Sequence, residues 1–240
     1  VMIDVSRGLL GIYENIDGLH KGPTVIIAVF PLKWTVAGMG HLFETGINAV
    51  IPSQRAIAGH LLDPKIKNRS RIHYLMANIQ TSMVAGEDNW ALLLDTDGHI
   101  AEGTGDNFFV VKDNVIITPE GRNILRGVSR AYVIEELAPQ LGLEVRQTNI
   151  EPYDVHSADE AFMTGTPFCM LPVTSLDKIA IGEGHVGPVF QALLDRWSDN
   201  QGLDIADQIK KWNALGTSGT SGTSGTSGSM APTPYRFQGP

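Results

Sequence analysis

Short runs of apolar and β-branched residues mark the strands that the sequence predicts. Residues 24–30 (TVIIAVF) form a continuous apolar run and predict a buried strand, and residues 47–53 (INAVIPS) do so more weakly. From residue 90 onward, apolar runs alternate with polar turns, which predicts a meander of antiparallel strands. The further predicted strands are 90–95, 100–103, 107–112, 115–119, 144–150 and two within 161–177, separated there by Gly165-Thr166-Pro167.

Three segments carry apolar residues at helical spacing. Residues 72–85, 129–142 and 189–200 each predict a helix, with Ser129 placed to cap the second and Gly142 to end it. The apolar positions are Ile72, Leu75, Met76, Ile79 and Met83 in the first helix, and Val133, Ile134 and Leu137 in the second. Because strands and helices are mixed without a regular βαβ repeat, the pattern predicts the α+β class.

Composition excludes several classes of protein. Hydrophobic residues make up 42% and charged residues 18% of the 240, which predicts a folded chain with a large core. No apolar run approaches the roughly 20 residues that span a bilayer, so no membrane partner is expected. A net charge of −8 has the wrong sign for binding nucleic acid. The single cysteine, Cys169, excludes an internal disulfide framework and favours a cytoplasmic location.

The C-terminal end differs in composition from the rest of the chain. Residues 215–229 repeat a Gly-Thr-Ser triplet, which is typical of an engineered flexible linker. Residues 230–240, starting at Met230, are interpreted as the native N-terminal leader of a small domain, and residues 1–214 as one folded domain. Since Val1 begins directly in an apolar run, we interpret the chain as a circular permutation or one half of a split protein; a trailing tag is the alternative.

A lysine in a basic cluster is the first candidate for chemistry. Lys67 lies between an extended stretch and a predicted helix, close in sequence to Lys65, Arg69 and Arg71. Neighbouring positive charge lowers the pKa of a lysine, and a neutral amine is what a Schiff base with a carbonyl cofactor requires. A solvated basic surface is the alternative interpretation.

Two further segments could bind a charged ligand. Glu102 ends a predicted strand directly before Gly103 and Gly105, which predicts either a tight turn or a fixed carboxylate that a ligand can approach closely. This segment lacks the third glycine of a dinucleotide fingerprint. Gly127 precedes a helix whose first turn holds Val128 and Ser129, an arrangement that either caps the helix or binds a phosphate group.

Together these segments resemble the fold type IV family of pyridoxal 5′-phosphate (PLP) enzymes. That family includes branched-chain aminotransferases, D-amino acid transaminases, (R)-selective amine transaminases and aminodeoxychorismate lyases. The shared motifs are EGxGxNxF at residues 102–109, LxG[IV][ST]R at 125–130 and an IGxGxxGP-like segment at 181–188. The resemblance covers roughly Val1 to Trp212 and implies the family's large domain, an antiparallel-rich sheet or pseudo-barrel with flanking helices.

The resemblance also implies roles for individual residues. Lys67 would hold PLP as an internal aldimine and shuttle the substrate proton, and Glu102 would keep the pyridine nitrogen protonated. The cofactor-binding set it implies is Lys67, Glu102, Leu125, Gly127, Val128, Ser129 and Thr166, with Leu125 against the ring and Val128, Ser129 and Thr166 at the phosphate. Gly105, Gly165 and Pro167 would lie near the substrate. No metal is implied.

The expected function is amino-group transfer between an amine or amino acid and a keto acid, in a homodimer. The sequence departs from the family by lacking most of its N-terminal small domain, which a separate fragment could supply. It also carries Pro167 in a turn where amino acid aminotransferases have alanine, and Ile72 where branched-chain enzymes have a tyrosine. The alternatives are a lyase of the aminodeoxychorismate type and a non-catalytic split fragment.

Overall fold

The computed structural model describes residues 1–216, which form two units, residues 1–34 and the part of the chain from Thr35 onward. The predicted leader at 230–240 and residues 217–229 of the predicted linker lie outside the described residues, whereas residues 215 and 216, which were expected to begin the linker, end helix α8 (Ile205–Gly216).

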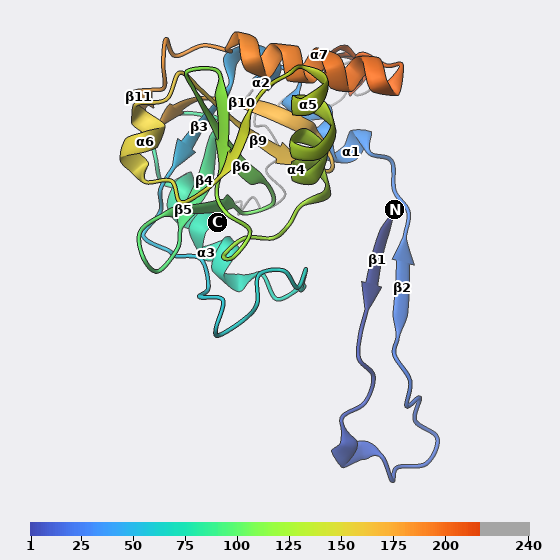
Figure 1. Cartoon of the computed structure of the whole chain (residues 1–240). Coiled ribbons are helices and arrows are strands. Elements are labelled where there is room, and N and C mark those ends of the chain that lie inside the picture. Colours follow the sequence, from blue (N-terminus) through green and yellow to red (C-terminus); the bar gives the residue numbers. More distant parts are fainter. Residues whose placement is uncertain (217–240) are drawn as a thin grey trace. The chain divides into compact units, whose positions relative to one another are not determined.

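The first unit is a two-stranded ribbon. Strands β1 (Met2–Val5) and β2 (Val25–Ala28) pair antiparallel, and a short 3₁₀ helix, η1 (Gly11–Tyr13), lies in the connection between them (Figure 1). The prediction of a buried strand at 24–30 is correct for the strand and wrong for its burial, because Ile27 is 63% exposed. A ribbon of two strands has no second layer to cover it, so its apolar residues stay at the surface.

The second unit is built on a mixed sheet of nine strands that closes on itself. Around the ring each strand pairs with the next in the order β10, β3, β4, β5, β6 and β9, and β9 returns to β10. Strands β7, β8 and β11 extend the sheet beyond this ring. The strands are β3 (Ile47–Val50), β4 (Asn89–Leu94), β5 (Ile100–Gly103), β6 (Asn107–Lys112), β7 (Val115–Thr118), β8 (Val145–Gln147), β9 (Glu160–Gly165), β10 (Cys169–Leu176) and β11 (Ile179–Ala180).

Most strand pairs are antiparallel, and the predicted meander is β4 through β7. Only the pairs β3 with β10, β3 with β4, and β7 with β8 are parallel among the described residues. The α+β class and the pseudo-barrel predicted from the sequence are therefore confirmed.

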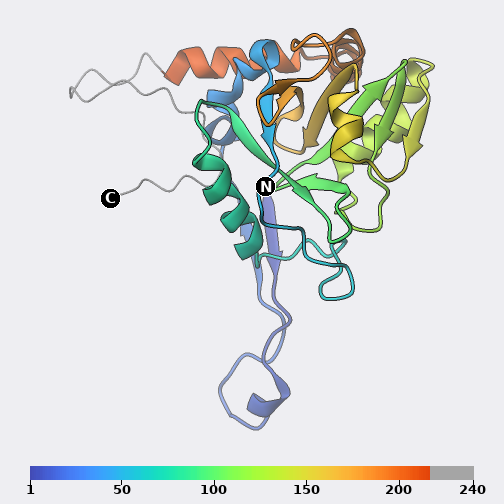
Figure 2. The ribbon, with the colours of Figure 1, turned by 90° about the vertical axis from the view of Figure 1, so that its left-hand side faces the viewer.

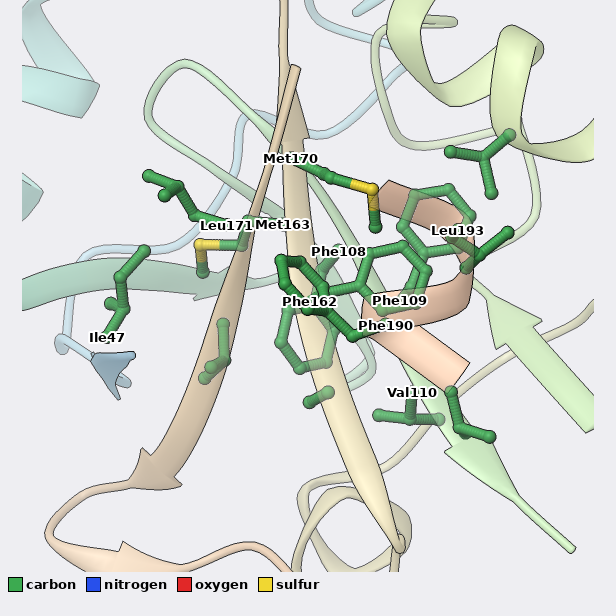
Figure 3. Packing of buried hydrophobic residues seen from close by; sticks show 14 of the residues in the cluster. Ile47, Phe108, Phe109, Val110, Phe162, Met163, Met170, Leu171, Phe190 and Leu193 are labelled. Atoms are coloured by element: carbon green, nitrogen blue, oxygen red, sulfur yellow. The ribbon is translucent and has the colours of Figure 1, made fainter. Parts of the chain in front are cut away.

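The continuous apolar runs explain which strands lie at the centre. Strands β3 and β9 are buried along their whole length, and so is β6 apart from its last residue. Such runs suit strands that are covered on both faces. Phe109 and Phe162, from the adjacent strands β6 and β9, stack with ring centroids 4.7 Å apart, and Phe190 packs against them from a helix (Figure 3).

Helices flank the sheet. Helix α3 (Ile72–Ser82) packs along β4, and α7 (Pro188–Gln201) packs over β9 (Figures 1 and 2). None of the helices in residues 1–216 combines the length and apolar character that crossing a bilayer requires. The remaining helical segments are α1 (Lys33–Val36), η2 (Ala37–Met39), α2 (Leu42–Thr45), α4 (Val128–Tyr132), the π-helical η3 (Val133–Leu137), α5 (Ala138–Gln140), α6 (Pro152–His156) and α8 (Ile205–Gly216).

Two predicted helices differ from expectation in detail. The residue that caps α4 is Gly127, one position before Val128, so Ser129 lies inside the first turn instead of capping it. In helix α3, Ala77 and Thr81 are buried, whereas Ile72 is 66% exposed. The side of α3 that faces β4 is therefore not the side that carries its large apolar residues. Small residues at 77 and 81 allow the helix backbone to approach the sheet closely.

A buried carboxylate joins α7 to the sheet. Glu160 accepts hydrogen bonds from the backbone N–H groups of Val189 (2.9 Å) and Phe190 (2.8 Å), at the positive end of the helix. A side chain at Gly187 would collide with it, since an added Cβ would lie 2.0 Å from Glu160 Cδ.

We expect Glu160→Ala to lower the free energy of unfolding by about 2–3 kcal/mol, because two buried N–H groups lose their acceptor and the helix loses a favourable charge. Urea denaturation followed by circular dichroism measures this change. The matched control is Glu144→Ala, an exposed residue whose loss should change stability by less than about 0.5 kcal/mol. Equal effects of the two variants would contradict the assignment.

Candidate functional site

A cavity of about 190 Å³ brings together nine of the ten predicted site residues. Its walls come from the loop before α3, the end of β5, the segment leading into α4, and the end of β9. The predicted residues that line it are Lys67, Glu102, Gly105, Leu125, Gly127, Val128, Ser129, Gly165 and Thr166. Segments up to 99 positions apart in sequence (residues 67 and 166) therefore meet at one place.

Lys67 lies in the loop between β3 and α3. The residue as a whole is exposed, but the surrounding protein partly withdraws its amino group from water. This partial burial lowers the pKa of Lys67, and the positive charges of Arg71 and Arg69 lower it further, while Glu102 acts in the opposite direction. The basic cluster thus shifts the pKa in the direction that the sequence predicted.

Glu102 is held by hydrogen bonds on both carboxylate oxygens. Its Oε1 accepts from the Tyr74 hydroxyl (2.9 Å), and its Oε2 accepts from the Leu125 backbone N–H (3.0 Å) and from Asn107 Nδ2 (3.2 Å). Only 5% of the residue is exposed. Burial raises the pKa of Glu102 to about 7, against the lowering effect of its donors and of nearby Lys67. A cationic group placed beside Glu102 would strongly favour the ionised form of this carboxyl group.

Two residues that hold Glu102 were not predicted from the sequence. Tyr74 lies seven positions after Lys67 in the first turns of α3, beneath the Arg71 guanidinium, whose carbon is 5.0 Å from the ring centroid. Asn107 belongs to the EGxGxNxF motif, and its Nδ2 donates to the Leu125 carbonyl oxygen (2.9 Å) as well as to Glu102. Asn107 could have been found, because it belongs to a motif that the sequence analysis quoted. Tyr74 had no such signal, because the tyrosine of the branched-chain enzymes corresponds to position 72. This chain has an isoleucine there, which is mostly exposed and does not line the cavity.

The start of α4 forms the opposite wall of the cavity. Gly127 caps the helix with extended backbone and no side-chain cap, and Ser129 is buried in the first turn. An added Cβ at Gly127 would lie 2.2 Å from Asn107 Oδ1, so only glycine fits there. The N–H groups of a first helical turn have no partner within the helix and are available to an anion. The helical segment continues without a break from residue 128 to residue 140, so its peptide dipoles add up to a partial positive charge at this N-terminal end.

The turn between β9 and β10 contributes differently from the prediction. Gly165 and Thr166 line the cavity with the other residues, but Pro167 does not. Pro167 instead borders a second cavity of about 80 Å³, which shares Gly105 and Asp106 with the first.

Asp106 is a buried acid that the sequence analysis did not single out. Burial raises its pKa to about 8, and the negative charge of Glu102 acts in the same direction. One of its oxygens, Oδ1, has no hydrogen-bond partner and packs over Gly103, where an added Cβ would lie 2.0 Å away.

The raised pKa of Asp106 predicts a pH-dependent stability. Between about pH 4, near its ordinary pKa of 3.8, and pH 8, the folded protein keeps a proton that the unfolded chain releases, so the free energy of unfolding falls as pH rises. We expect Asp106→Asn to weaken this dependence, to which the raised pKa of Glu102 also contributes, and to be more stable than the wild type at pH 8. Urea denaturation from pH 5 to pH 8.5 measures it. The exposed Asp113→Asn is the control, and a wild-type pH profile in Asp106→Asn would refute the assignment.

One group of three possible metal ligands occurs in residues 1–216, at Asp95, Asp97 and His99 in the turn between β4 and β5. Both oxygens of Asp95 are already engaged. Its Oδ1 accepts from the backbone N–H groups of Asp97 and His99, and its Oδ2 accepts from Asn123. The three residues therefore form a hydrogen-bonded hairpin turn, and the absence of a metal stays a prediction.

The fold and the cavity together define a class of protein. It is an α+β protein with a closed mixed sheet, in which a lysine, a buried carboxylate and the start of a helix line one cavity. Residues 1–176 match the family described as amino-transferase class IV. The chain belongs to the class IV aminotransferase family, as the resemblance implied.

Individual relatives agree with this assignment. The chain is 38% identical over 178 residues to a putative branched-chain-amino-acid aminotransferase of Methanocaldococcus jannaschii, an alignment that covers 74% of this chain and 59% of the relative. The crystal structure of the branched-chain amino acid aminotransferase of Escherichia coli superposes with a TM-score of 0.69 at 32% identity, covering 83% of this chain and 63% of that one. The PLP-bound branched-chain aminotransferase of Thermobaculum terrenum gives a TM-score of 0.65 at 26% identity, over 88% and 67%. The chain thus spans about three fifths of the length of the M. jannaschii relative.

Proposed function

We propose that this chain binds pyridoxal 5′-phosphate in the larger cavity and takes part in transferring an amino group between an amine or amino acid and a keto acid. The observation that carries the proposal is Glu102, a buried carboxylate with both oxygens fixed, at the same cavity as Lys67. Membership of the class IV aminotransferase family and the PLP-bound relative support the same cofactor.

The donor set fits the three chemical parts of PLP. Lys67 would hold the cofactor through Nζ, and Glu102 would pair with the protonated ring nitrogen. Val128 and Ser129 at the helix start, with Gly127 and Thr166 beside them, would bind the phosphate, and Leu125 would contact the ring. Bound in this way, PLP supplies an electron sink that stabilises negative charge at the substrate carbon.

The residues themselves carry out the remaining tasks. The lowered pKa of Lys67 makes a neutral amine accessible, which Nζ needs in order to take up and return the substrate proton. The pKa of Glu102, about 7 in the protein alone, will fall when a cation lies beside it, so the pair will be charged at neutral pH. Tyr74 and Asn107 keep the carboxylate in one orientation while this happens.

The larger assembly belongs to the same proposal. We expect a homodimer, in the cytoplasm, with the part of the family's fold that this chain does not span supplied by a further polypeptide segment. Light scattering of the purified chain, alone and with such a segment, tests the expected assembly.

The cofactor assignment is tested by adding PLP, reducing with borohydride and mapping the modified peptide by mass spectrometry. We expect an absorbance band in the near-visible range and a reduced pyridoxyl group on Lys67. Lys65, two positions away and paired with Asp63, is the internal control and should stay unlabelled. Label scattered over several lysines would overturn the proposal. Pyruvate release without an amino acceptor would point to the lyase activity instead.

A further inference from the structure

We propose that Arg71 is a positioning residue that holds a fixed positive charge beside Lys67 and thereby keeps the amine of that lysine uncharged. This inference rests on the proposed function, in which Nζ of Lys67 has to be neutral before it can hold a carbonyl cofactor. Arg71 lies four positions after Lys67 and lines the same cavity. Lys65 and Arg69, the other basic residues close to Lys67 in sequence, do not line it.

Two contacts fix the guanidinium of Arg71 at the cavity wall. Its Nη2 donates a hydrogen bond to the backbone carbonyl oxygen of Thr104, in the turn between β5 and β6. Its guanidinium carbon lies over the Tyr74 ring, 5.0 Å from the ring centroid. A planar guanidinium that stacks on an aromatic ring and bonds to a carbonyl group is held in one orientation. The charge of Arg71 therefore stays beside the cavity.

The turn that accepts this hydrogen bond is itself held to α3. The Thr104 hydroxyl donates to Asn78 Oδ1 (3.2 Å), so Arg71 at the start of α3 and Asn78 within it both bond to the same residue. The glycines on either side of Thr104 differ. An added Cβ at Gly103 would lie 2.0 Å from Asp106 Oδ1, whereas at Gly105 it would meet nothing within 4 Å. The bonds to Thr104 thus hold a turn that has open space on its Gly105 side.

Arg71 is the neighbouring cation with the greatest influence on Lys67. A like charge beside an amine disfavours the protonated form of that amine. Burial lowers the pKa of Lys67 most, the Arg71 guanidinium is the next largest cause, and Arg69 adds a smaller lowering. Glu102 acts in the opposite direction. The position of Arg71 and its effect on Lys67 therefore agree.

The other titratable groups around Arg71 offset its charge only in part at neutral pH. Burial raises the pKa of Glu102 to about 7 and that of Asp106 to about 8, so a substantial fraction of each is protonated at pH 7. Burial and Arg71 both lower the pKa of His73, and burial raises the pKa of Tyr74, so these two side chains are uncharged at pH 7. A net positive charge therefore remains beside Lys67.

Trace labelling of the cofactor-free 240-residue chain with acetic anhydride tests the inference. Only an uncharged amine reacts, so the labelling rate of Lys67 at pH 8, mapped by mass spectrometry, reports its charge. The limiting rate near pH 11 reports its accessibility. The test variant is Arg71→Gln, which can still donate to Thr104 but has no charge, and Arg71→Lys restores the charge. The matched control is Arg69→Gln, and Lys65 is the internal reference.

We expect the labelling rate of Lys67 at pH 8 to fall at least about threefold in Arg71→Gln, because removing a neighbouring positive charge favours the protonated amine. The limiting rate should not change, Arg71→Lys should label like the wild type, and Arg69→Gln should lose less than Arg71→Gln. Arg71→Met gives the same comparison if circular dichroism shows that Arg71→Gln has lost its fold.

An unchanged rate at pH 8 in Arg71→Gln would overturn the inference. Equal losses at pH 8 and pH 11 would also overturn it, because they would show a change in accessibility alone, and so would a loss in Arg69→Gln as large as that in Arg71→Gln. Failure to attach PLP at Lys67 would count against the proposed function instead. The labelling of the cofactor-free chain would still decide the role of Arg71.

Discussion

Replacing Lys67 with arginine should abolish covalent attachment of PLP and reduce amino-group transfer by at least about 10³-fold. Arginine keeps the positive charge at this position, but it cannot supply a neutral primary amine at physiological pH. In the role proposed for Lys67, the substitution removes both the bond to the cofactor and the group that moves the substrate proton, a step that alone contributes about 10²- to 10⁴-fold. Single-turnover absorbance changes with an amino donor measure the rate, and borohydride reduction measures the attachment.

The neighbouring lysine provides the control for this result. Lys65 lies in the same loop, where its amine is 2.7 Å from Asp63 Oδ1. Lys65→Arg should leave attachment and rate within about twofold of the wild type. If Lys67→Arg still formed a borohydride-stable adduct at another single site, the role given to Lys67 would be wrong.

Replacing Glu102 with glutamine should slow amino-group transfer by about 10²- to 10³-fold, which is the usual cost of losing one preorganised electrostatic contact in an active site. Glutamine has nearly the same shape but no negative charge, so it could not keep the ring nitrogen protonated, which is the role proposed for Glu102. Unlike Lys67→Arg, this variant should still attach PLP at Lys67. The rate of the half-reaction and the yield of the reduced adduct, measured on the same sample, separate the two effects.

The carboxylate network gives this prediction its controls. Glu144→Gln changes an exposed carboxylate that pairs with Arg146 and should leave the rate unchanged. Tyr74→Phe removes only the donor to Glu102 Oε1, whose hydrogen bond is the largest of the influences that lower the pKa of Glu102. That variant should therefore move the acidic limb of the pH–rate profile toward higher pH. A full rate in Glu102→Gln would exclude the ring-nitrogen role.

Much of the fold could be predicted because continuous apolar runs become central strands. Residues 108–111 and 161–163 are examples, and both lie in strands of the closed ring of the sheet. Residues 24–30 look the same in sequence but lie in a ribbon of two strands, so burial depends on neighbours that a local pattern does not contain. Helix α3 shows the same limit. Its apolar positions identified the helix, but the side facing β4 is set by the small residues at 77 and 81.

The candidate site divides in a similar way. Lys67, Glu102 and the helix start at Gly127 could be found because each belongs to a motif with a chemical reason for its residue types. Tyr74 could not be found, since its hydroxyl reaches Glu102 only after α3 packs against β4. The difference between Gly103 and Gly105 also depends on tertiary contacts, because both are plain glycines in one turn until the position of Asp106 is known.

The ribbon of residues 1–34 has a practical consequence for work with this protein. Cross-strand pairing places Ile3 opposite Ile27 and Val5 opposite Val25. Four apolar side chains that are 55–66% exposed therefore lie on one face of the ribbon. Within the described residues, β1 and β2 pair only with each other, which leaves two free edges as well. We expect these surfaces to promote self-association as the solution is concentrated. We therefore expect colloidal stability during storage to depend on the ribbon.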